Sequence, residues 1–490
     1  MKGLAEHKKA CDLWQRGKRN IALKKHEKAC QLSPNNPVFL RHYAFALMQV
    51  HEPAKSAQVM LHALDCAWRE PSHLIDTCVT ARSAQLYDLI YNFLTEKKLP
   101  DPIKYFYADA LDRRGMSADA LSLIQTIPEP KRLAFPFLQL LFAQLLVRNK
   151  QYAEAKSVID TINTEQLPTP LQAELHYTRA SIHDKLNAPT PAFQELRQAK
   201  ALLLKQQAAT PTLAQQALTL NRAILPISAK ESTPAPNPPV ILCGHPRSGT
   251  TLIEQVLDSH PSVLSVEEQD CFFSQVATPL HTSQTSPLEL AAHLTNLTDS
   301  EISAYKNDYL EKLHRYLPEP NNKRVVDKFP DLSTTLGLYR KVVPEGKMII
   351  ALRDPRDVVL SCYFQNLPLN PASAPYLQLK SAAEKYIATI QCWLESKEHF
   401  TDGWIETRYE DWVHNTEKEA KRVLSFLELD WDPTVLSFHT RHKTVSSPTY
   451  ADVAQPIYTR SIGRWQHYQK QLDPILDTLD PICQQLGYST

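Results

Sequence analysis

Residues 240–257 read VILCGHPRSGTTLIEQVL, and this stretch decides the fold of the second half of the chain. An apolar run leads into Gly244, a loop continues to Gly249, and an amphipathic stretch starts at Thr250. A turn of this kind from a strand into a helix exposes backbone N–H groups, which bind phosphate together with the helix dipole. We therefore expect a strand at 239–244, a helix from residue 250 onward, and an anion site between them.

The loop differs from the nucleoside triphosphatase loop in its cation. That loop reads G-x-x-x-x-G-K-[ST], and Thr250 stands here in the place of its lysine. Arg247 supplies a planar cation inside the loop, while Ser248 and Thr251 add hydroxyl groups. A later strand ends in Asp354, but Arg353 precedes it, so cations surround the site where a magnesium shell would need carboxylates and water. The sequence therefore predicts a doubly anionic nucleotide bound without a metal ion.

Short β-branched runs alternate with helical patterns after this loop. We expect further strands at 324–329, 347–354 and 404–411, each followed by a helix. Continuous apolar strands between helices indicate a parallel sheet that is buried on both faces. The fold class expected here is α/β.

Two local signals mark helix starts in this part. Residues 282–316 are predicted as a helical insertion, in which Thr298 and Glu301 form a capping box. Asn415 is predicted to cap the helix that follows the last strand.

The first part of the chain repeats with a period near 34 residues. Small residues recur 12 positions apart, as in Ala10 and Ala22, Ala108 and Ala120, Ala143 and Ala155, and Ala180 and Ala192, with a related set at Ala44, Ser56 and Ala63. Alanine at the crossing of a helical hairpin lets its two helices approach closely. The spacing leaves room for one more unit, hidden within 72–94. The pattern resembles tetratricopeptide repeats from residue 1 to about 205, and an irregular helical bundle is the alternative.

A proline-rich stretch separates the two parts of the chain. We expect a tetratricopeptide-repeat helical domain at 1–227, a linker at 228–238 and an α/β domain at 239–490. Stacked repeats form a groove that commonly binds peptides or proteins. A polypeptide partner and a homodimer are the two uses that this array allows.

Bulk composition excludes several classes of protein. The net charge of the 490 residues is +1, which argues against a globally basic nucleic-acid binder. The nine cysteines form no C-x-x-C pair, which favours reduced thiols over a zinc ribbon or a disulfide scaffold. The first residues lack the apolar core of a signal peptide, and no run of 18 apolar residues occurs. A cytoplasmic location without a membrane span is the expectation.

Two motifs about 100 residues apart resemble those of sulfotransferases that use 3′-phosphoadenosine 5′-phosphosulfate (PAPS). PRSGTTL at 246–252 looks like their 5′-phosphosulfate loop, and LRDPRDVVLSCY at 352–363 looks like their 3′-phosphate segment. The resemblance is to the branch that includes protein-tyrosine sulfotransferases and bacterial proteins joining tetratricopeptide repeats to a sulfotransferase domain. It implies that 239–490 is a P-loop-like α/β sulfotransferase domain, with PAPS as donor and adenosine 3′,5′-bisphosphate (PAP) as product.

The resemblance also implies roles for individual residues. The 5′-phosphosulfate ligands would be Arg247, Ser248, Gly249, Thr250 and Thr251, and the 3′-phosphate ligands Arg353 and Ser361. Glu268 matches the second residue of a double glutamate that is the proposed base of the tyrosine-sulfating branch. Lys328 matches a lysine that stabilises the bridging oxygen of the leaving phosphate, and Tyr409 matches a position near the nucleotide. Arg247 and Lys328 could stabilise charge during in-line transfer, while a carboxylate could accept the hydroxyl proton.

The C-terminal stretch 446–465 resembles the segment that closes over the nucleotide in this family. Gln455 occupies the place where a lysine is expected. Arg460 or Arg464 would then be the substitute phosphate ligand.

Each of these assignments has a structural alternative. The loop hydroxyls could only cap a helix, Arg353 could pair with Asp354 or Asp357, and Ser361 could be an ordinary helix hydroxyl. Lys328 could be solvated and Tyr409 a core residue, and Glu267 or Asp270 could replace Glu268.

Two other functions compete with sulfuryl transfer. An ATP-dependent phosphotransferase would need magnesium, and a non-catalytic repeat scaffold would carry a degenerate nucleotide domain. For a sulfotransferase, the resemblance allows a protein tyrosine, a sugar or a small alcohol as acceptor.

Overall fold

The computed structural model describes residues 2–50, 52–164, 167–205, 213–227, 237–282, 286–317, 323–440 and 459–489. The chain forms two units, of which the N-terminal unit is Met1–Ile162 and the C-terminal unit starts at Asn163. Each is described by itself below. Within the described residues, no helix combines the length and the apolar character needed to cross a lipid bilayer.

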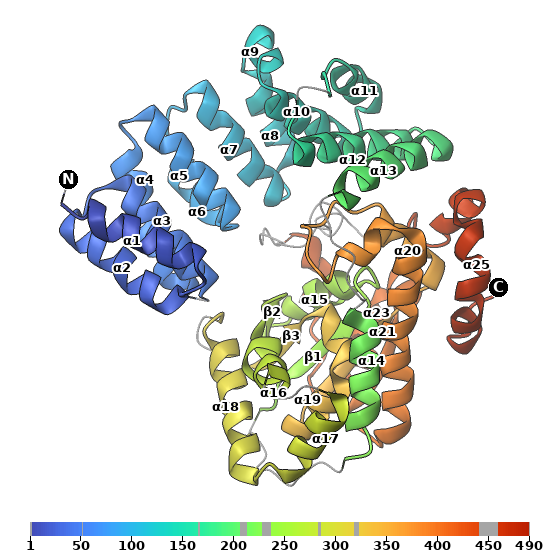
Figure 1. Ribbon diagram of the computed structural model, residues 1–490. Helices are drawn as coiled ribbons and strands as arrows, with labels where there is room; N and C mark the ends of the chain where they lie inside the picture. Colours follow the sequence, from blue (N-terminus) through green and yellow to red (C-terminus); the bar gives the residue numbers. More distant parts are fainter. Residues whose placement is uncertain are drawn as a thin grey trace. The chain divides into compact units, whose positions relative to one another are not determined.

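The N-terminal unit is a run of paired helices (Figure 1). The pairs are α1 (Leu4–Gln15) with α2 (Arg19–Leu32), α3 (Pro37–Gln49) with α4 (Pro53–Ala67), α5 (Pro71–Ser83) with α6 (Tyr87–Leu94), α7 (Asp101–Arg113) with α8 (Ser117–Gln125), and α10 (Pro136–Arg148) with α11 (Tyr152–Asp160). A short helix, α9 (Glu129–Leu133), precedes the last pair. The predicted tetratricopeptide-like array of helix pairs is confirmed.

The small residues that predicted the repeat lie where the two helices of a pair meet. Ala10 on α1 and Ala22 on α2 have no exposed surface, and Ser56 Oγ on α4 donates to the carbonyl oxygen of Ala44 on α3 at 2.7 Å. The hidden unit within 72–94 is the pair α5 and α6. Cys78 and Ile90 occupy its crossing positions, again 12 residues apart and buried, so larger side chains replace the alanines there.

The C-terminal unit begins with three more helices: α12 (Thr169–Lys185), α13 (Pro189–Leu204) and α14 (Leu213–Ile224). The first two continue the repeat pattern through Ala180 and Ala192, yet they belong with the α/β part. The division between the units thus falls between Ile162 and Asn163, earlier than the proline-rich stretch at 228–238. Most of that stretch lies outside the described residues.

Buried polar contacts explain why α14 belongs to the C-terminal unit. Asn221 Nδ2 donates to the carbonyl oxygen of Cys392 at 3.2 Å and to Ser396 Oγ at 3.0 Å, both on α21 (Leu379–His399). Its Oδ1 accepts from the backbone N–H of Gly337 at 3.1 Å, on α19 (Leu336–Val342). One amide side chain therefore joins three helices.

The α/β part is built on a five-stranded sheet in the order β2-β3-β1-β4-β5, with every pair parallel. The strands are β1 (Val240–Gly244), β2 (Val263–Glu267), β3 (Arg324–Lys328), β4 (Lys347–Leu352) and β5 (Trp404–Arg408). The predicted parallel sheet is confirmed, with one strand more than the sequence indicated. In an open parallel sheet, ligands bind at the carboxyl ends of the strands where the strand order reverses, which here is the end of β1.

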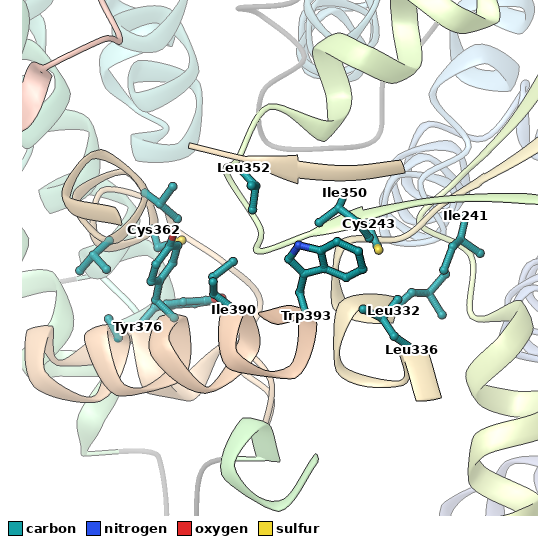
Figure 2. Packing of buried hydrophobic residues seen from close by; sticks show 14 of the residues in the cluster. Ile241, Cys243, Leu332, Leu336, Ile350, Leu352, Cys362, Tyr376, Ile390 and Trp393 are labelled. Carbon is teal, nitrogen blue, oxygen red and sulfur yellow. The ribbon is translucent and has the colours of Figure 1, made fainter. Parts of the chain in front are cut away.

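Alternate residues of the central strands bury into two different cores. Ile241 and Cys243 of β1 and Ile350 of β4 face α21, where Trp393 packs against them (Figure 2). Val240 and Leu242 face the opposite side, where α15 (Thr250–Asp258) and α23 (Thr416–Phe426) cover the sheet. This two-sided burial is the reason why the strands read as continuous apolar runs.

Two predicted strand ends are wrong by a few residues. β5 ends at Arg408, because Tyr409 starts the short helix α22 (Tyr409–His414). β4 ends at Leu352, because Asp354 caps α20 (Pro355–Tyr363) by accepting from the backbone N–H of Arg356 at 2.9 Å.

The helical signals in between are confirmed. The predicted insertion contains α17 (Pro287–Asn296) and α18 (Asp299–His314), while α16 (Thr278–Thr282) ends where it starts. The capping box of Thr298 and Glu301 starts α18, and Asn415 caps α23 through the backbone N–H of Lys418. The last helix of the chain is α25 (Gln469–Gln485).

Candidate active site

The loop between β1 and α15 holds two glycines where a side chain has no room. Gly244 has φ 145°, and a Cβ atom there would collide with the carbonyl oxygen of Ala351 on β4. Gly249 has φ 95°, and a Cβ atom there would lie 2.6 Å from the ring of Tyr409. Between them Arg247 has a left-handed φ of 75°. The loop is therefore shaped by the close approach of β4 on one side and Tyr409 on the other.

The groups gathered at this loop fit a phosphate-type anion. Ser248 Oγ is buried and has no hydrogen-bond partner among the described residues. Thr250 and Thr251 form the first turn of α15, whose N-terminus is the positive end of the helix dipole. A buried hydroxyl without a partner costs free energy unless a ligand satisfies it. The predicted loop ligands thus lie together, as a 5′-phosphosulfate or similar group would require.

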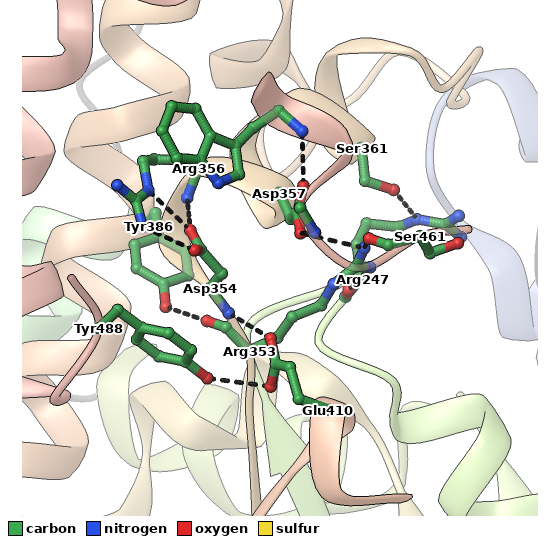
Figure 3. A network of polar contacts seen from close by, with 12 residues as sticks. Arg247, Arg353, Asp354, Arg356, Asp357, Ser361, Tyr386, Glu410, Ser461 and Tyr488 are labelled. Carbon is green, nitrogen blue, oxygen red and sulfur yellow. Dashed lines mark hydrogen bonds and ion pairs between the residues drawn. The ribbon is translucent and has the colours of Figure 1, made fainter. Parts of the chain in front are cut away.

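Arg247, Arg353 and Ser361 converge beside the loop (Figure 3). Arg247 Nε donates to Ser361 Oγ on α20 at 3.0 Å, and Arg353 Nη1 donates to the carbonyl oxygen of Arg247 at 3.1 Å. The guanidinium of Arg353 stacks on the ring of Tyr409, 4.5 Å from its centroid. Arg353 Nε is buried without a hydrogen-bond partner among the described residues. The two sequence motifs, about 100 residues apart, therefore form one polar cluster.

The second cationic group lies at the carboxyl end of β3. Lys328 is fully buried, and its Nζ lies 2.7 Å from Glu268 Oε1 and 3.5 Å from Glu267 Oε1. The buried Glu254 of α15 contributes a third carboxylate, with Oε2 3.5 Å from Nζ. Burial alone would lower the pKa of this lysine, but the carboxylates of Glu254, Glu268 and Glu267 hold it above its ordinary value. Lys328 is therefore a charged ammonium group, and the alternative of a solvated lysine is wrong.

Glu268 is held in an unusual backbone conformation next to this lysine. Its φ is 48°, in the left-handed region, and its backbone N–H donates to the carbonyl oxygen of Lys328 at 2.8 Å. A residue other than glycine adopts this conformation at a cost of about 1–2 kcal/mol, and such strain concentrates at functional sites. Its carboxylate is 38% exposed, so it pairs with Lys328 while remaining accessible.

A family model and several relatives match the part of the chain that holds this site. Residues 238–433 match the model described as Sulfotransferase family. This part of the chain is a sulfotransferase-family domain. An uncharacterized protein of Aquifex aeolicus (strain VF5) is 25% identical over 248 residues, which cover 49% of this chain and 32% of that protein. Protein-tyrosine sulfotransferase 1 of Danio rerio is 26% identical over 199 residues, which cover 41% of this chain and 55% of that protein.

The chain therefore spans about a third of the Aquifex relative and about half of the Danio one. Among solved structures, the sulfotransferase domain from the Synechococcus PCC 7002 olefin synthase is 20% identical, covers 49% of this chain and 91% of its own, and gives a TM-score of 0.35.

The C-terminal segment of the sulfotransferase domain is tied to α20 by backbone contacts. Asp357 accepts from the backbone N–H of Gly463 at 2.7 Å and of Trp465 at 2.8 Å. Arg353 Nη2 donates to the carbonyl oxygen of Ser461 (Figure 3). Burial raises the pKa of Asp357 to about 6, against the opposing effect of Arg353. The Nη2 of Arg353 lies 4.0 Å from Asp357 Oδ2, so the predicted alternative ion pair exists beside the predicted site.

One of the two arginines predicted as substitute phosphate ligands, Arg464, is paired with another side chain. Arg464 Nη2 donates to Asp184 Oδ1 on α12 at 2.9 Å, and the Arg464 guanidinium lies over the ring of Phe364. This pairing commits Arg464 to a structural contact. Gln455 lies outside the described residues, and Arg460 keeps its place as the predicted alternative.

Sequence reasoning missed Glu254, whose only signal is a carboxylate inside a helical stretch, 250–257, that is buried throughout. His245 directly precedes the loop in the sequence and is a candidate minor ligand on that ground. It is fully buried, and its Nε2 lies 3.2 Å from the hydroxyl of Tyr376. Burial and the nearby Lys385 lower the pKa of His245 to about 3, so it is neutral. His260 contacts the carbonyl oxygen of Asp430 through Nε2 at 2.9 Å, as a helix-end residue would.

Proposed function

We propose that the C-terminal unit transfers the sulfuryl group of PAPS to an acceptor hydroxyl by in-line displacement. The observation that carries this proposal is the row of cations at the carboxyl ends of three adjacent strands. β1 ends at the loop with Arg247, β3 ends at Lys328, and β4 is followed by Arg353. The register pairs Leu242 with Lys328 and Gly244 with Ala351, so these ends lie at one edge of the sheet.

Two anionic groups of one nucleotide match this arrangement. Arg247, Ser248, Gly249, Thr250 and Thr251 would hold the 5′-phosphosulfate, and Arg353 and Ser361 would hold the 3′-phosphate. Arg353 and Ser361 both bond to Arg247, which lets one charge network contact both ends of the ligand. The ring of Tyr409, which packs against Gly249 and Arg353, would line the nucleotide-binding site.

Lys328 and two of the carboxylates around it would have separate roles in the transfer. The donor supplies a sulfuryl group whose departure leaves charge on a phosphate oxygen. Lys328 Nζ would stabilise that charge as the S–O bond to the phosphate breaks. Glu268 would accept the proton of the acceptor hydroxyl as its oxygen bonds to sulfur. Glu254, which is fully buried and 3.5 Å from Lys328, would keep the lysine charged and in place.

The pairing of Asp354 with Arg356 supports this proposal over magnesium-dependent phosphotransfer. In P-loop phosphotransferases a hydroxyl and an aspartate hold magnesium. Asp354, the carboxylate that follows β4, is bound to Arg356 through two contacts of 3.0 and 2.8 Å and to the first turn of α20. Its oxygens are thus engaged in a structural pair, which supports a nucleotide held by protein cations.

A tyrosine side chain is the first acceptor to test. The Danio relative carries the name protein-tyrosine sulfotransferase 1, and a helical repeat array is suited to a polypeptide partner. A sugar and a small alcohol are the other acceptors that the same chemistry serves.

Isothermal titration of the full chain with PAP in EDTA tests the donor site. We expect micromolar or tighter binding, at least tenfold weaker in Arg353→Ala and unchanged in Arg315→Ala, an exposed arginine directly after α18 that serves as the matched control. Binding of ATP with magnesium, without binding of PAP, would contradict the proposal and favour a phosphotransferase. Incubation with labelled PAPS and tyrosine peptides, oligosaccharides or simple alcohols then identifies the acceptor.

A further inference from the structure

A group of metal-ligating side chains lies in the N-terminal unit, apart from the sulfotransferase domain in the chain. His7 and Cys11 sit one turn apart on α1, and His42 sits on α3. One ligand atom from each lies within 4.8 Å of the other two. Neither the sequence motifs nor the sulfotransferase chemistry uses these residues.

The distances around Cys11 are close to those of a tetrahedral zinc site. Cys11 Sγ lies 3.7 Å from His7 Nε2 and 4.0 Å from His42 Nδ1. Zinc binds thiolate at about 2.3 Å and imidazole at about 2.0–2.1 Å, so a sulfur and a nitrogen on one zinc ion are about 3.6 Å apart. The side chains need to close by only a few tenths of an ångström on the sulfur side.

Ring packing restrains the imidazole of His7 beside the thiol. The His7 ring stacks with those of Phe39 and His42, at centroid distances of 4.6 and 5.0 Å. His7 is buried, as is His26 of α2, whose ring lies 5.7 Å from that of His7. The His7 atom that lies nearest to the thiol of Cys11 is Nε2, so a metal ion bound to Cys11 would take Nε2 of His7 as its ligand.

We propose that His7, Cys11 and His42 bind one zinc ion in the N-terminal unit, with water as the fourth ligand. A cysteine and two histidines form a donor set of the borderline-soft type that zinc prefers. Binding replaces the S–H bond of Cys11 with a sulfur–zinc bond and releases one proton to solvent. Because the ligands come from α1 and α3, the ion would fasten the first helix of the array to the second helix pair.

This placement has a consequence for the repeat array. A terminal unit contacts a neighbour on one side only and is therefore the least stable part of a stack. A metal ion joining α1 to α3 would offset that weakness, because a ligand that binds only the folded state stabilises it.

The test uses the tag-free full chain, stripped of metal with EDTA and then titrated with Co²⁺ and Zn²⁺. We expect one Co²⁺ per chain, with the near-ultraviolet band of a cobalt–thiolate bond, and displacement of the cobalt by Zn²⁺. Cys11→Ser should lose the thiolate band and bind Zn²⁺ at least tenfold more weakly. Cys66→Ser removes another half-buried cysteine of the same unit and should change neither result.

Hydrogen exchange adds a readout that does not depend on spectroscopy. Zn²⁺ should slow amide exchange in α1 and α3 of the wild type and leave that of Cys11→Ser unchanged, with circular dichroism confirming that the variant is folded. His42→Ala should behave as Cys11→Ser does, whereas His62→Ala, an exposed histidine of α4, should behave as the wild type. Absence of Co²⁺ and Zn²⁺ binding by the wild type, or an unchanged thiolate band in Cys11→Ser, would overturn the proposal.

Discussion

Lys328 Nζ lies 2.7 Å from Glu268 Oε1, while the backbone N–H of Glu268 donates to the carbonyl oxygen of Lys328 at 2.8 Å. The end of β3 and the residue after β2 are thus joined twice, through their side chains and through their backbones. The backbone bond holds Glu268 at φ 48°, which aims its carboxylate at the lysine. The proposed base and a buried cation are thereby held next to each other without a ligand, which is the preorganisation that electrostatic catalysis needs.

Replacing Glu268 with glutamine should abolish most turnover without affecting donor binding. A general base contributes about 10²–10⁴-fold to the rate, so we expect a loss of that size in Glu268→Gln. Glu267→Gln should lose less, because its carboxylate lies farther from Lys328, at 3.5 Å. Single-turnover rates with labelled PAPS and the acceptor found above check this, and PAP titration shows whether both variants bind the nucleotide as the wild type does. Equal losses in the two variants would contradict the assignment of Glu268.

Removing the charge of Lys328 should destabilise the C-terminal unit. In Lys328→Met the carboxylate of Glu254 stays fully buried without its cation, and breaking a buried ion pair in this way costs about 3–5 kcal/mol. The double variant Lys328→Met with Glu254→Gln should regain much of that loss, because the fully buried carboxylate is then neutral and the remaining partners, Glu267 and Glu268, are partly exposed. Thermal unfolding of the four proteins in a double-mutant cycle measures the coupling, and additive effects would show that the pair is not energetically linked.

Alanine at position 249 should weaken nucleotide binding. The new Cβ atom would meet the Tyr409 ring at 2.6 Å, and the left-handed backbone adds a cost of about 1–2 kcal/mol. Because relieving this clash would displace the loop from the conformation proposed to hold the anion, we expect PAP affinity to fall by about tenfold or more, which corresponds to about 1.4 kcal/mol. Gly17→Ala is the matched control, because Gly17 also has a positive φ but has nothing within 4 Å of the new atom. Equal PAP affinity in Gly249→Ala and the wild type would rule out this role for the loop.

Local patterns predicted those features of the fold that local chemistry determines. The 12-residue spacing of Ala10 and Ala22 predicts a helical hairpin, because close helix crossing needs a small side chain. Cys78 and Ile90 have the same spacing but larger side chains than alanine. Only the period of the repeat therefore indicates this helix pair. The sequence analysis does not predict β2, because this strand lies at the sheet edge with only Val263 and Val266 buried, so VLSVE lacks the continuous apolar run of a central strand.

Site residues at the ends of strands could be predicted from the sequence. Site residues that only tertiary packing brings to the site could not. Arg247, Lys328 and Arg353 each follow an apolar strand, and parallel strands place such ends at one edge. Glu254 lies inside a buried helix, and its contact with Lys328 depends on how α15 lies over β3. No local pattern carries that information, because the partners are separated by more than seventy residues.

Asp327 should make the stability of the C-terminal unit depend on pH. It precedes Lys328 on β3, and its buried carboxylate accepts from the hydroxyl of Tyr309 at 2.9 Å. Burial raises the pKa of Asp327 to about 7. Because the folded pKa exceeds the unfolded one, the contribution of this group to stability is fully present below about pH 4 and is lost as the pH rises through about 7.

Asp327→Asn removes that loss, since the amide cannot ionise and can still accept from Tyr309. Relative to the wild type, we expect the variant to gain melting temperature at pH 8 and to gain little at pH 4. Asp402→Asn, at a carboxylate that is 85% exposed, serves as the control and should track the wild type at both values. A pH-independent difference between Asp327→Asn and the wild type would contradict the raised pKa.

The three helices before the sheet should be needed for the sulfotransferase domain to fold. α14 is bonded to α19 and α21 through Asn221, and Arg222 adds a bidentate ion pair with Glu395 of α21. A fragment of residues 163–490 should therefore melt cooperatively and bind PAP within about threefold of the full chain. A fragment of residues 239–490, which starts at the predicted domain boundary, should melt at a lower temperature or aggregate, because it exposes the apolar faces of α19 and α21.

The full-chain variant Asn221→Leu isolates the polar part of this contact. It leaves the backbone N–H of Gly337 buried without a partner, and an unsatisfied buried group costs about 1–3 kcal/mol. We expect a lower melting temperature of the C-terminal unit with PAP affinity preserved below the transition. Thr219→Leu on the exposed side of the same helix is the control.

If the fragment of residues 239–490 melts at the same temperature as the fragment of residues 163–490, the helices before the sheet are an attachment to the domain and not part of its core.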